Sequence, residues 1–188
     1  MRKAIKYTIF KTRWGYFGLA GAEGRLLASR LPIAGYETAK SHLLKGLEDA
    51  RCDKMFFREL AEQITAYFEG SYVDFGKDIP VIFDRLSGFA RGVLTACRDV
   101  RFGETISYGG LAKRVGRPGA ARVVGRVMAN NPLPLIIPCH RVIYSNGGVG
   151  GFGAIGGVKL KKRMLELEQQ GVGLESLGKI GKGKMVKK

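Results

Sequence analysis

A thiol, an imidazole and a guanidinium stand next to one another in the sequence at Cys139, His140 and Arg141. Prolines and an apolar run precede them, so the segment is stiff and partly buried. Cysteine attacks carbon as the thiolate, and the pKa of a free thiol, about 8.5, falls when positive groups or an acid–base partner lie close. His140 and Arg141 are groups of this kind. The segment therefore indicates a nucleophilic cysteine, and the competing interpretation is a buried structural cysteine with accidental polar neighbours.

The residues in front of this segment have the pattern of two short helices separated by a tight turn. Ser107 is a suitable N-cap for a helix over residues 108–115, and a stretch rich in glycine and proline ends that helix. A second helix over residues 120–130 carries Arg122 and Arg126 on one side, with small residues that permit close approach to a DNA groove. Two helices across a short turn, the second of them basic, predict a helix-turn-helix DNA-binding unit.

The positive charge of the chain is concentrated in its second half. Residues 1–84 contain 13 Lys and Arg and 11 Asp and Glu, for a net charge of +2, whereas residues 85–188 contain 19 and 5, for a net charge of +14. This asymmetry indicates a polyanion bound mainly by the second half, with nucleic acid as the first candidate. A basic surface with a basic tail is the alternative.

The N-terminal part predicts a small sheet covered by helix. Runs rich in β-forming residues over 7–12, 14–20 and 25–31 are separated by glycines, as in an antiparallel meander. Between residues 36 and 69, apolar residues recur at spacings of three and four, as two helices require.

We therefore predict an α+β fold of two domains. Residues 1–82 form an N-terminal α/β domain whose antiparallel sheet is covered by helix. Residues 83–170 form a mainly helical domain that binds DNA and carries the reactive cysteine. In residues 171–188 lysine alternates with glycine without an apolar face, so we expect a basic flexible tail that is largely disordered from residue 172.

Composition excludes a disordered protein and a membrane protein. Apolar residues make up 45% of the 188 residues, the mean hydropathy is −0.04, and no apolar run is long enough to span a membrane. The first residues do not form a signal peptide, and the odd number of cysteines indicates a reducing compartment, so we expect a cytoplasmic protein. We expect Cys52 and Cys97 to be non-catalytic and His42 to lie on the surface, and no spacing of Cys and His predicts a metal site.

Residues 151–156 have the pattern G-x-G-x-x-G of a dinucleotide-binding turn. Such a turn needs a preceding strand, a following helix and an acidic residue on a second strand about 20 residues later. The remaining residues predict one helix and a basic tail, so we exclude a dinucleotide site.

The cysteine segment resembles the signature of the O6-alkylguanine-DNA alkyltransferases, also called methylated-DNA–protein-cysteine methyltransferases. The matching residues are Asn131-Pro132 and Ile137-Pro138-Cys139-His140-Arg141-Val142. The similarity continues through Phe102–Tyr108, Ala120–Gly125, Gly147, Gly150–Phe152, Gly156-Gly157, Lys161 and Met164-Leu165. It covers residues 86–170 closely, and Tyr67–Gly70 with Val73–Phe75 fit the weaker N-terminal pattern of the family.

The resemblance implies a fold and an activity. The N-terminal domain would be RNase H-like, and the C-terminal domain would carry a winged helix-turn-helix. The protein would be a DNA repair enzyme, a monomer that binds double-stranded DNA in the minor groove and flips the damaged base out of the duplex. It would transfer the alkyl group of O6-alkylguanine, and of O4-alkylthymine, irreversibly to its own cysteine in a single turnover, without a cofactor or a metal.

The resemblance also implies catalytic roles. Cys139 would displace guanine from the alkyl carbon, and His140 would remove the thiol proton through a water. Glu168 or Glu166 would orient the imidazole, and the alignment favours Glu168. Asn131 would tie the recognition helix to the cysteine segment by hydrogen bonds.

Other residues would contact the DNA and the base. Arg122 would fill the space left by the flipped base, and Tyr108 would crowd the adjacent phosphate and donate to a ring nitrogen. Further DNA contacts are expected at Ala121, Arg126 and Met128. The expected substrate pocket consists of Val142, Phe152, Gly153, Ala154, Lys161 and Arg141. The loop after Phe152 is longer than is usual in the family, so the N–H that meets the guanine oxygen belongs to Gly153 or Ala154.

Two kinds of related protein are the alternatives. A non-catalytic protein that binds or signals alkylation damage recognises O6-alkylguanine without transfer, but such proteins lack the reactive cysteine that this chain has at Cys139. A transcriptional regulator with an alkyltransferase domain needs an additional metal-binding N-terminal module, for which neither the length nor the cysteines suffice.

Overall fold

The N-terminal half is built on a sheet in which three strands form the predicted meander. β1 (Lys6–Thr12), β2 (Gly15–Ala22) and β3 (Arg25–Ile33) pair antiparallel in the computed structural model, which describes residues 4–84 and 86–181, with side chains through residue 172. A short strand, β4 (Arg51–Cys52), joins β1 in parallel, and the strand order is β3-β2-β1-β4. The sheet is therefore mixed and not purely antiparallel as predicted, because so short a strand has no periodicity that the sequence would show.

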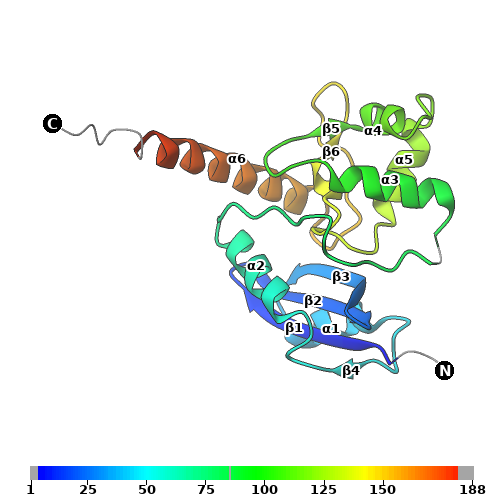
Figure 1. Ribbon diagram of the computed structural model, residues 1–188, viewed down its shortest axis with the longest axis vertical. Coiled ribbons are helices and arrows are strands. Elements are labelled where there is room, and N and C mark those ends of the chain that lie inside the picture. Colours follow the sequence, from blue (N-terminus) through cyan, green and yellow to red (C-terminus); the bar gives the residue numbers. More distant parts are fainter. Residues whose placement is uncertain (1–3, 85, 182–188) are drawn as a thin grey trace.

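Helices cover both faces of this sheet (Figure 1). α1 (Tyr36–Leu44) packs on one face, where Leu43 is fully buried in a small cluster with residues of β1, β2 and β3. α2 (Arg58–Phe68) lies against the other face, and its Ile64 and Phe68 belong to the main core. The spacing of three and four that predicts these helices therefore marks the sides that face the sheet.

The second half of the chain is mainly helical. Its elements are α3 (Gly88–Arg98), β5 (Ile106–Ser107), α4 (Tyr108–Arg114), α5 (Ala121–Ala129), the single-turn 3-10 helix η1 (Cys139–Arg141), β6 (Val142–Ile143) and α6 (Gly157–Gly181). α3, α4 and α5 pack on one another, and β5 pairs in parallel with β6. Ser107 caps α4 as predicted, because its Oγ accepts a hydrogen bond from the N–H of Gly110 at 2.9 Å.

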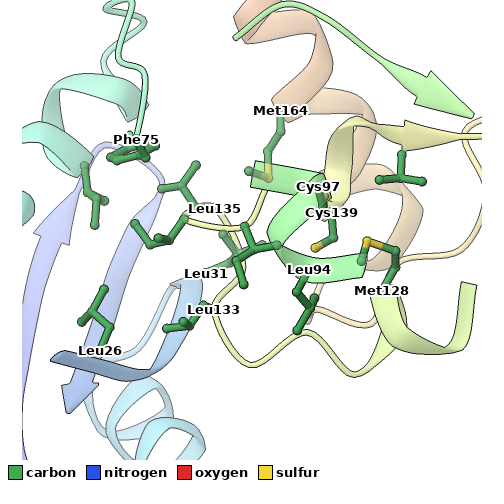
Figure 2. Packing of buried hydrophobic residues seen from close by; sticks show 14 of the residues in the cluster. Leu26, Leu31, Phe75, Leu94, Cys97, Met128, Leu133, Leu135, Cys139 and Met164 are labelled. Atoms are coloured by element: carbon green, nitrogen blue, oxygen red, sulfur yellow. The ribbon is translucent and has the colours of Figure 1, made fainter. Parts of the chain in front are cut away.

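One hydrophobic core connects the two halves (Figure 2). Leu26 and Leu31 of β3 pack in the same cluster as Leu133 and Leu135, which precede the cysteine, and as Cys139 itself. The apolar surface of the sheet is thus buried against the helical half, and the elements on either side of the proposed boundary near residue 82 share this core. The sheet consequently supports the segment that carries the cysteine.

α6 is longer than predicted. It runs through Gly181, into the range for which the sequence predicts a flexible tail, whereas residues 182–188 lie outside the described residues. At Gly171 the helix still packs closely against the ring of Phe102, and a helix that is already formed gains one hydrogen bond with each further residue. Its C-terminal part projects from the rest of the structure (Figure 1). In the part of the chain that the structure describes, no helix, α6 included, is both long and apolar enough to cross a membrane.

Candidate active site

Cys139 forms the inner wall of a cavity between α4, α5 and the loop that follows β6. The residue is the first of η1, is only 5% exposed, and lines a cavity of about 700 Å³. The cavity is also lined by Tyr108, Gly109, Ala121, Arg122, Gly125, Arg126, Met128, Ala129, Tyr144, Ser145, Gly151, Phe152 and Gly153. The thiol is therefore shielded from bulk solvent but reachable by a group that enters the cavity.

Asn131 links the end of α5 to the cysteine segment. Its Nδ2 donates a hydrogen bond to the carbonyl oxygen of Ile137 at 2.8 Å, and its Oδ1 accepts one from the N–H of Leu133 at 3.0 Å. Because both partners lie in the segment before Cys139, the Asn131 side chain fixes the path of the chain into the site.

Ser29 of β3 holds the same segment from the side of the sheet. Its N–H donates to the carbonyl oxygen of Pro132 at 2.9 Å, and its Oγ donates to the carbonyl oxygen of Pro134 at 2.8 Å. The next residue, Leu135, has a φ of 77°, a left-handed conformation that costs a non-glycine residue about 1 kcal/mol. Such a conformation persists only when the surroundings impose it, and the hydrogen bonds of Ser29 do so.

His140 and Arg141 both meet Glu168 of α6. The Nε2 atom of His140 lies 2.7 Å from Oε1 of Glu168, and Arg141 donates from Nε to Oε2 and from a terminal nitrogen to Oε1, each at 2.9 Å. All three side chains are buried, whereas Glu166 is exposed. The structure thus brings Glu168, and not Glu166, to the histidine.

This environment ionises Glu168 and leaves His140 neutral. Burial by itself raises the pKa of Glu168, but its hydrogen bond with His140 and the charge and hydrogen bonds of Arg141 outweigh burial and lower the pKa to about 2. Burial lowers the pKa of His140 and outweighs the opposing effect of Glu168. A neutral imidazole that donates from Nε2 to a carboxylate leaves Nδ1 as an acceptor, and Nδ1 is buried without a hydrogen-bond partner among the described residues. The pair can therefore accept one proton at Nδ1.

Two opposing effects act on the Cys139 thiol. Burial raises its pKa, while a hydrogen bond from the Asn131 side chain and the positive charge of Lys161 lower it in part. Lys161 of α6 is itself buried, its Nζ donates to the carbonyl oxygen of Val142 at 2.5 Å, and burial lowers its pKa to about 8. A cation held inside the protein near the thiol favours the thiolate.

We predict that Lys161→Met slows the reaction of the Cys139 thiol. Without the cation a smaller fraction of the thiol is ionised at neutral pH, so alkylation by iodoacetamide should be about tenfold slower and shift to higher pH. The measurement is mass spectrometry of the modified peptide over a pH series, with a thermal melt to establish folding. The exposed neighbour offers a matched control, Lys162→Met, which should react like the unchanged protein. Equal rates for both variants would show that Lys161 does not act on the thiol.

The α4–α5 pair forms the outer wall of the cavity. All five residues expected to contact DNA line it: Tyr108, Ala121, Arg122, Arg126 and Met128. Gly153, in the loop after β6, packs so closely against the end of α5 that a Cβ there would lie 2.7 Å from the carbonyl oxygen of Ala129, so only glycine fits. The cavity thus combines a basic rim, small residues and a thiol.

Two of the six residues predicted for the substrate pocket line the cavity, and four do not. Phe152 and Gly153 line the cavity, but Arg141, Val142 and Lys161 are buried behind the cysteine and do not. Arg141 faces Glu168, because successive side chains of the 3-10 turn η1 point in directions about 120° apart. The loop residue Ala154 is partly buried and is not among the lining residues either.

Sequence reasoning missed several residues of the site. Tyr144 and Ser145 line the cavity, and the Tyr144 ring lies 5.4 Å from that of Tyr108. Tyr67 of α2 donates from its hydroxyl to Oε1 of Glu168 at 2.8 Å. A signal existed for Tyr67, which belongs to the N-terminal pattern Tyr67–Gly70, but the pattern alone does not identify its partner.

The other two thiols and the second histidine lie outside the cavity. Cys52 is exposed on β4, His42 is exposed on α1, and Cys97 is buried in α3. Burial raises the pKa of Cys97 well above its ordinary value, so this thiol is unreactive. Among the described residues, no group of three or more His, Cys, Asp or Glu side chains is placed to hold a metal ion.

Comparisons with known proteins point to one family. A family model described as 6-O-methylguanine DNA methyltransferase, DNA binding domain, matches residues 88–170. A methylated-DNA–protein-cysteine methyltransferase of Mycobacterium tuberculosis is 34% identical over 165 residues, which span 88% of this chain and 93% of that protein. One from Cricetulus griseus is 35% identical over 175 residues, which span 87% of this chain and 82% of that protein.

Solved structures show the same similarity. The crystal structure of the Mycobacterium tuberculosis O6-methylguanine methyltransferase matches with a TM-score of 0.72 at 34% identity, covering 88% of this chain and 93% of that one. A crystal structure of the same organism's OGT in complex with DNA matches with the same score, identity and coverage.

Proposed function

The chain belongs to the methylated-DNA–protein-cysteine methyltransferase family, and from this premise we propose that it repairs DNA by accepting an alkyl group on Cys139. The substrates would be O6-alkylguanine and O4-alkylthymine in double-stranded DNA. The observation that supports this best is the thiol on the inner wall of the cavity, next in sequence to a buried imidazole whose Nδ1 has no partner among the described residues.

The reaction would be one displacement at the alkyl carbon. The thiol proton passes through a water to Nδ1 of His140, the sulfur forms a bond to the alkyl carbon, and the bond from that carbon to O6 breaks with its electron pair remaining on guanine. Tyr108, on the cavity wall, donates to a ring nitrogen and so stabilises the departing base. The positive charge formed on the imidazole is balanced by Glu168, 2.7 Å from Nε2.

The acceptor would not be regenerated. The product on Cys139 is a thioether, whose sulfur is a poor leaving group at carbon. The cavity contains no second thiol, since Cys97 is not among its lining residues. Each protein molecule therefore accepts one alkyl group.

Binding would use α4 and α5 as a helix-turn-helix of the winged type that enters the minor groove, beside an N-terminal domain of RNase H-like form. The small residues Ala121, Gly125 and Ala129 line the cavity and allow close approach of a nucleic-acid backbone. Arg122, exposed at the start of α5, would occupy the stack when the damaged base turns into the cavity. One protein molecule would suffice, because the site is complete within one chain.

The test is transfer from a duplex oligonucleotide that contains one O6-methylguanine. We expect one guanine restored per protein molecule and no further turnover when more DNA is added. Repeated turnover would contradict the suicide mechanism. Binding of the damaged duplex with no loss of methyl would instead identify a non-catalytic damage-binding protein.

We predict that binding weakens steeply with salt and that Arg126 contributes to this dependence. A side chain that neutralises one phosphate changes the slope of log K against log salt by about 1, so Arg126→Ala should lower the slope by about that amount. The measurement is fluorescence anisotropy with duplex DNA at several salt concentrations. Arg58→Ala, on the exposed side of α2 in the N-terminal half, is the control and should leave the slope unchanged. A DNA affinity that does not change with ionic strength would contradict the proposed phosphate contacts.

A further inference from the structure

A tyrosine from the N-terminal half reaches the candidate catalytic pair. Tyr67 lies on α2 and is fully buried, and its hydroxyl donates to Oε1 of Glu168 at 2.8 Å across 101 residues of sequence. The same oxygen faces Nε2 of His140 at 2.7 Å. Tyr67 and His140 therefore share one carboxylate oxygen.

The surrounding hydrogen bonds leave the carboxylate little freedom. Oε2 of Glu168 accepts from Nε of Arg141 at 2.9 Å and from the N–H of Gly103 at 3.0 Å. Oε1 accepts from Tyr67 as well as from Arg141 and His140. Every one of these donors except Tyr67 belongs to the C-terminal half.

Apolar contacts hold the Tyr67 ring independently of its hydroxyl. The centre of the Tyr67 ring lies 5.0 Å from the ring centre of Phe68, 5.8 Å from that of Phe75 and 5.9 Å from that of Phe102. A hydroxyl buried in such surroundings is costly unless it forms a hydrogen bond, and Glu168 is the partner that the structure gives it.

Contacts between the two halves keep α2 beside α6. The guanidinium of Arg163 on α6 lies 3.8 Å from the centre of the Trp14 ring, and that ring lies 5.2 Å from the ring of Phe68 on α2. A packed interface therefore fixes the position of the Tyr67 hydroxyl beside Glu168.

We propose that Tyr67 is a positioning residue for alkyl transfer, which fixes the Glu168 carboxylate against His140 and so brings the N-terminal half into the reaction. This inference rests on the proposed function. The hydroxyl withdraws electron density from the oxygen that faces the imidazole, so it also limits how strongly Glu168 increases the basicity of Nδ1. Burial and the charge of Glu168 raise the pKa of Tyr67 well above its ordinary value, so the hydroxyl remains a donor at every working pH.

Replacing Tyr67 with phenylalanine separates the hydroxyl from the ring. In Tyr67→Phe the carboxylate keeps more of its negative charge for His140, so the pKa of His140 should rise and the acid limb of the transfer rate should move to higher pH. Transfer at neutral pH should also fall about tenfold, because the imidazole is less well oriented. The charged groups that act on His140 are Glu168, Arg141 and Lys161. Tyr67 acts on it through its hydrogen bond to Glu168, and the substitution changes only Tyr67.

The measurement is an NMR titration of the histidine rings together with single-turnover transfer rates over the same pH range. The chain has two histidines, so the resonances of exposed His42 provide an internal reference in the same spectra. Tyr72→Phe is the matched control, since Tyr72 also packs on Phe102, at 4.9 Å, but is exposed. It should leave the His140 titration and the transfer rate unchanged.

The outcomes distinguish this inference from the proposed function. Absence of transfer by the unchanged protein would overturn the proposed function. Transfer by the unchanged protein, with the same His140 titration and pH profile in Tyr67→Phe, would overturn the inference alone. Should Tyr67→Phe not fold, the test uses 3-fluorotyrosine at position 67, which has nearly the same shape as tyrosine and is a stronger hydrogen-bond donor. It should lower the pKa of His140. An unchanged His140 titration would contradict the inference.

Discussion

A Cys139→Ala protein should transfer no alkyl group and should still bind duplex DNA with the affinity of the unchanged protein. Among the described residues, the thiol of Cys139 and the thioether of Met128 are the only sulfur atoms that line the cavity. A thioether has no proton to lose and is a weak nucleophile here. The residues proposed to contact DNA lie on α4 and α5, so removing one sulfur atom from the inner wall leaves them in place. Transfer is measured as guanine restored in a methylated duplex, and binding by anisotropy.

The matched control is Cys52→Ala. Cys52 is exposed on β4, outside the cavity, so this variant should transfer at the unchanged rate. Methyl uptake by Cys139→Ala, or loss of uptake by Cys52→Ala, would place the acceptor elsewhere.

Glu168→Gln should lose both activity and stability. The amide cannot balance the charge that forms on His140, and general-base catalysis contributes about 10²- to 10⁴-fold, so we expect the transfer rate to fall at least 10²-fold. Arg141 then remains buried without its counter-ion, and breaking a buried ion pair from one side costs about 3–5 kcal/mol. Single-turnover kinetics and urea unfolding measure the two effects.

The stability effect should depend on pH. The folded-state pKa of Glu168 is lowered to about 2, below its ordinary value of 4.5, so its contribution is fully present above pH 4.5 and is lost as the pH falls toward 2. The difference in the free energy of unfolding between the two proteins should therefore shrink in acid. Glu166→Gln, two residues earlier and exposed, is the control and should change neither rate nor stability. If Glu168→Gln were as active as this control, Glu168 would have no part in the transfer mechanism.

Local sequence signals were sufficient for most of the fold. The meander of β1, β2 and β3 follows from glycine-separated β-rich runs, and the start of α4 follows from Ser107, because strands, turns and caps depend on neighbouring residues. β4 escaped prediction because its pairing with β1 depends on where α1 and α2 place it. The full length of α6 was not predicted, because its glycines and lysines show no helical pattern, although the helix is already formed and packed upstream.

The candidate site, like the fold, could be predicted from local sequence only in part. The cysteine, the histidine and the two arginines of α5 are visible as motifs, but the direction of a side chain within η1 is not, so Arg141 was assigned to the cavity although it faces Glu168. Ser29 and Tyr67 were missed because each acts on a residue about 100 positions away, through packing that no local pattern encodes. The N-terminal half contributes to the site through these two hydroxyls.

Peptide mass mapping tests the central claim most directly. After incubation with duplex DNA that contains O6-methylguanine, trypsin should release residues 127–141 with the added mass of one methyl group, about 14 Da, on Cys139. The peptides that contain Cys52 and Cys97 should keep their original masses. Methylated DNA that loses its methyl group while residues 127–141 remain unmodified would contradict the account.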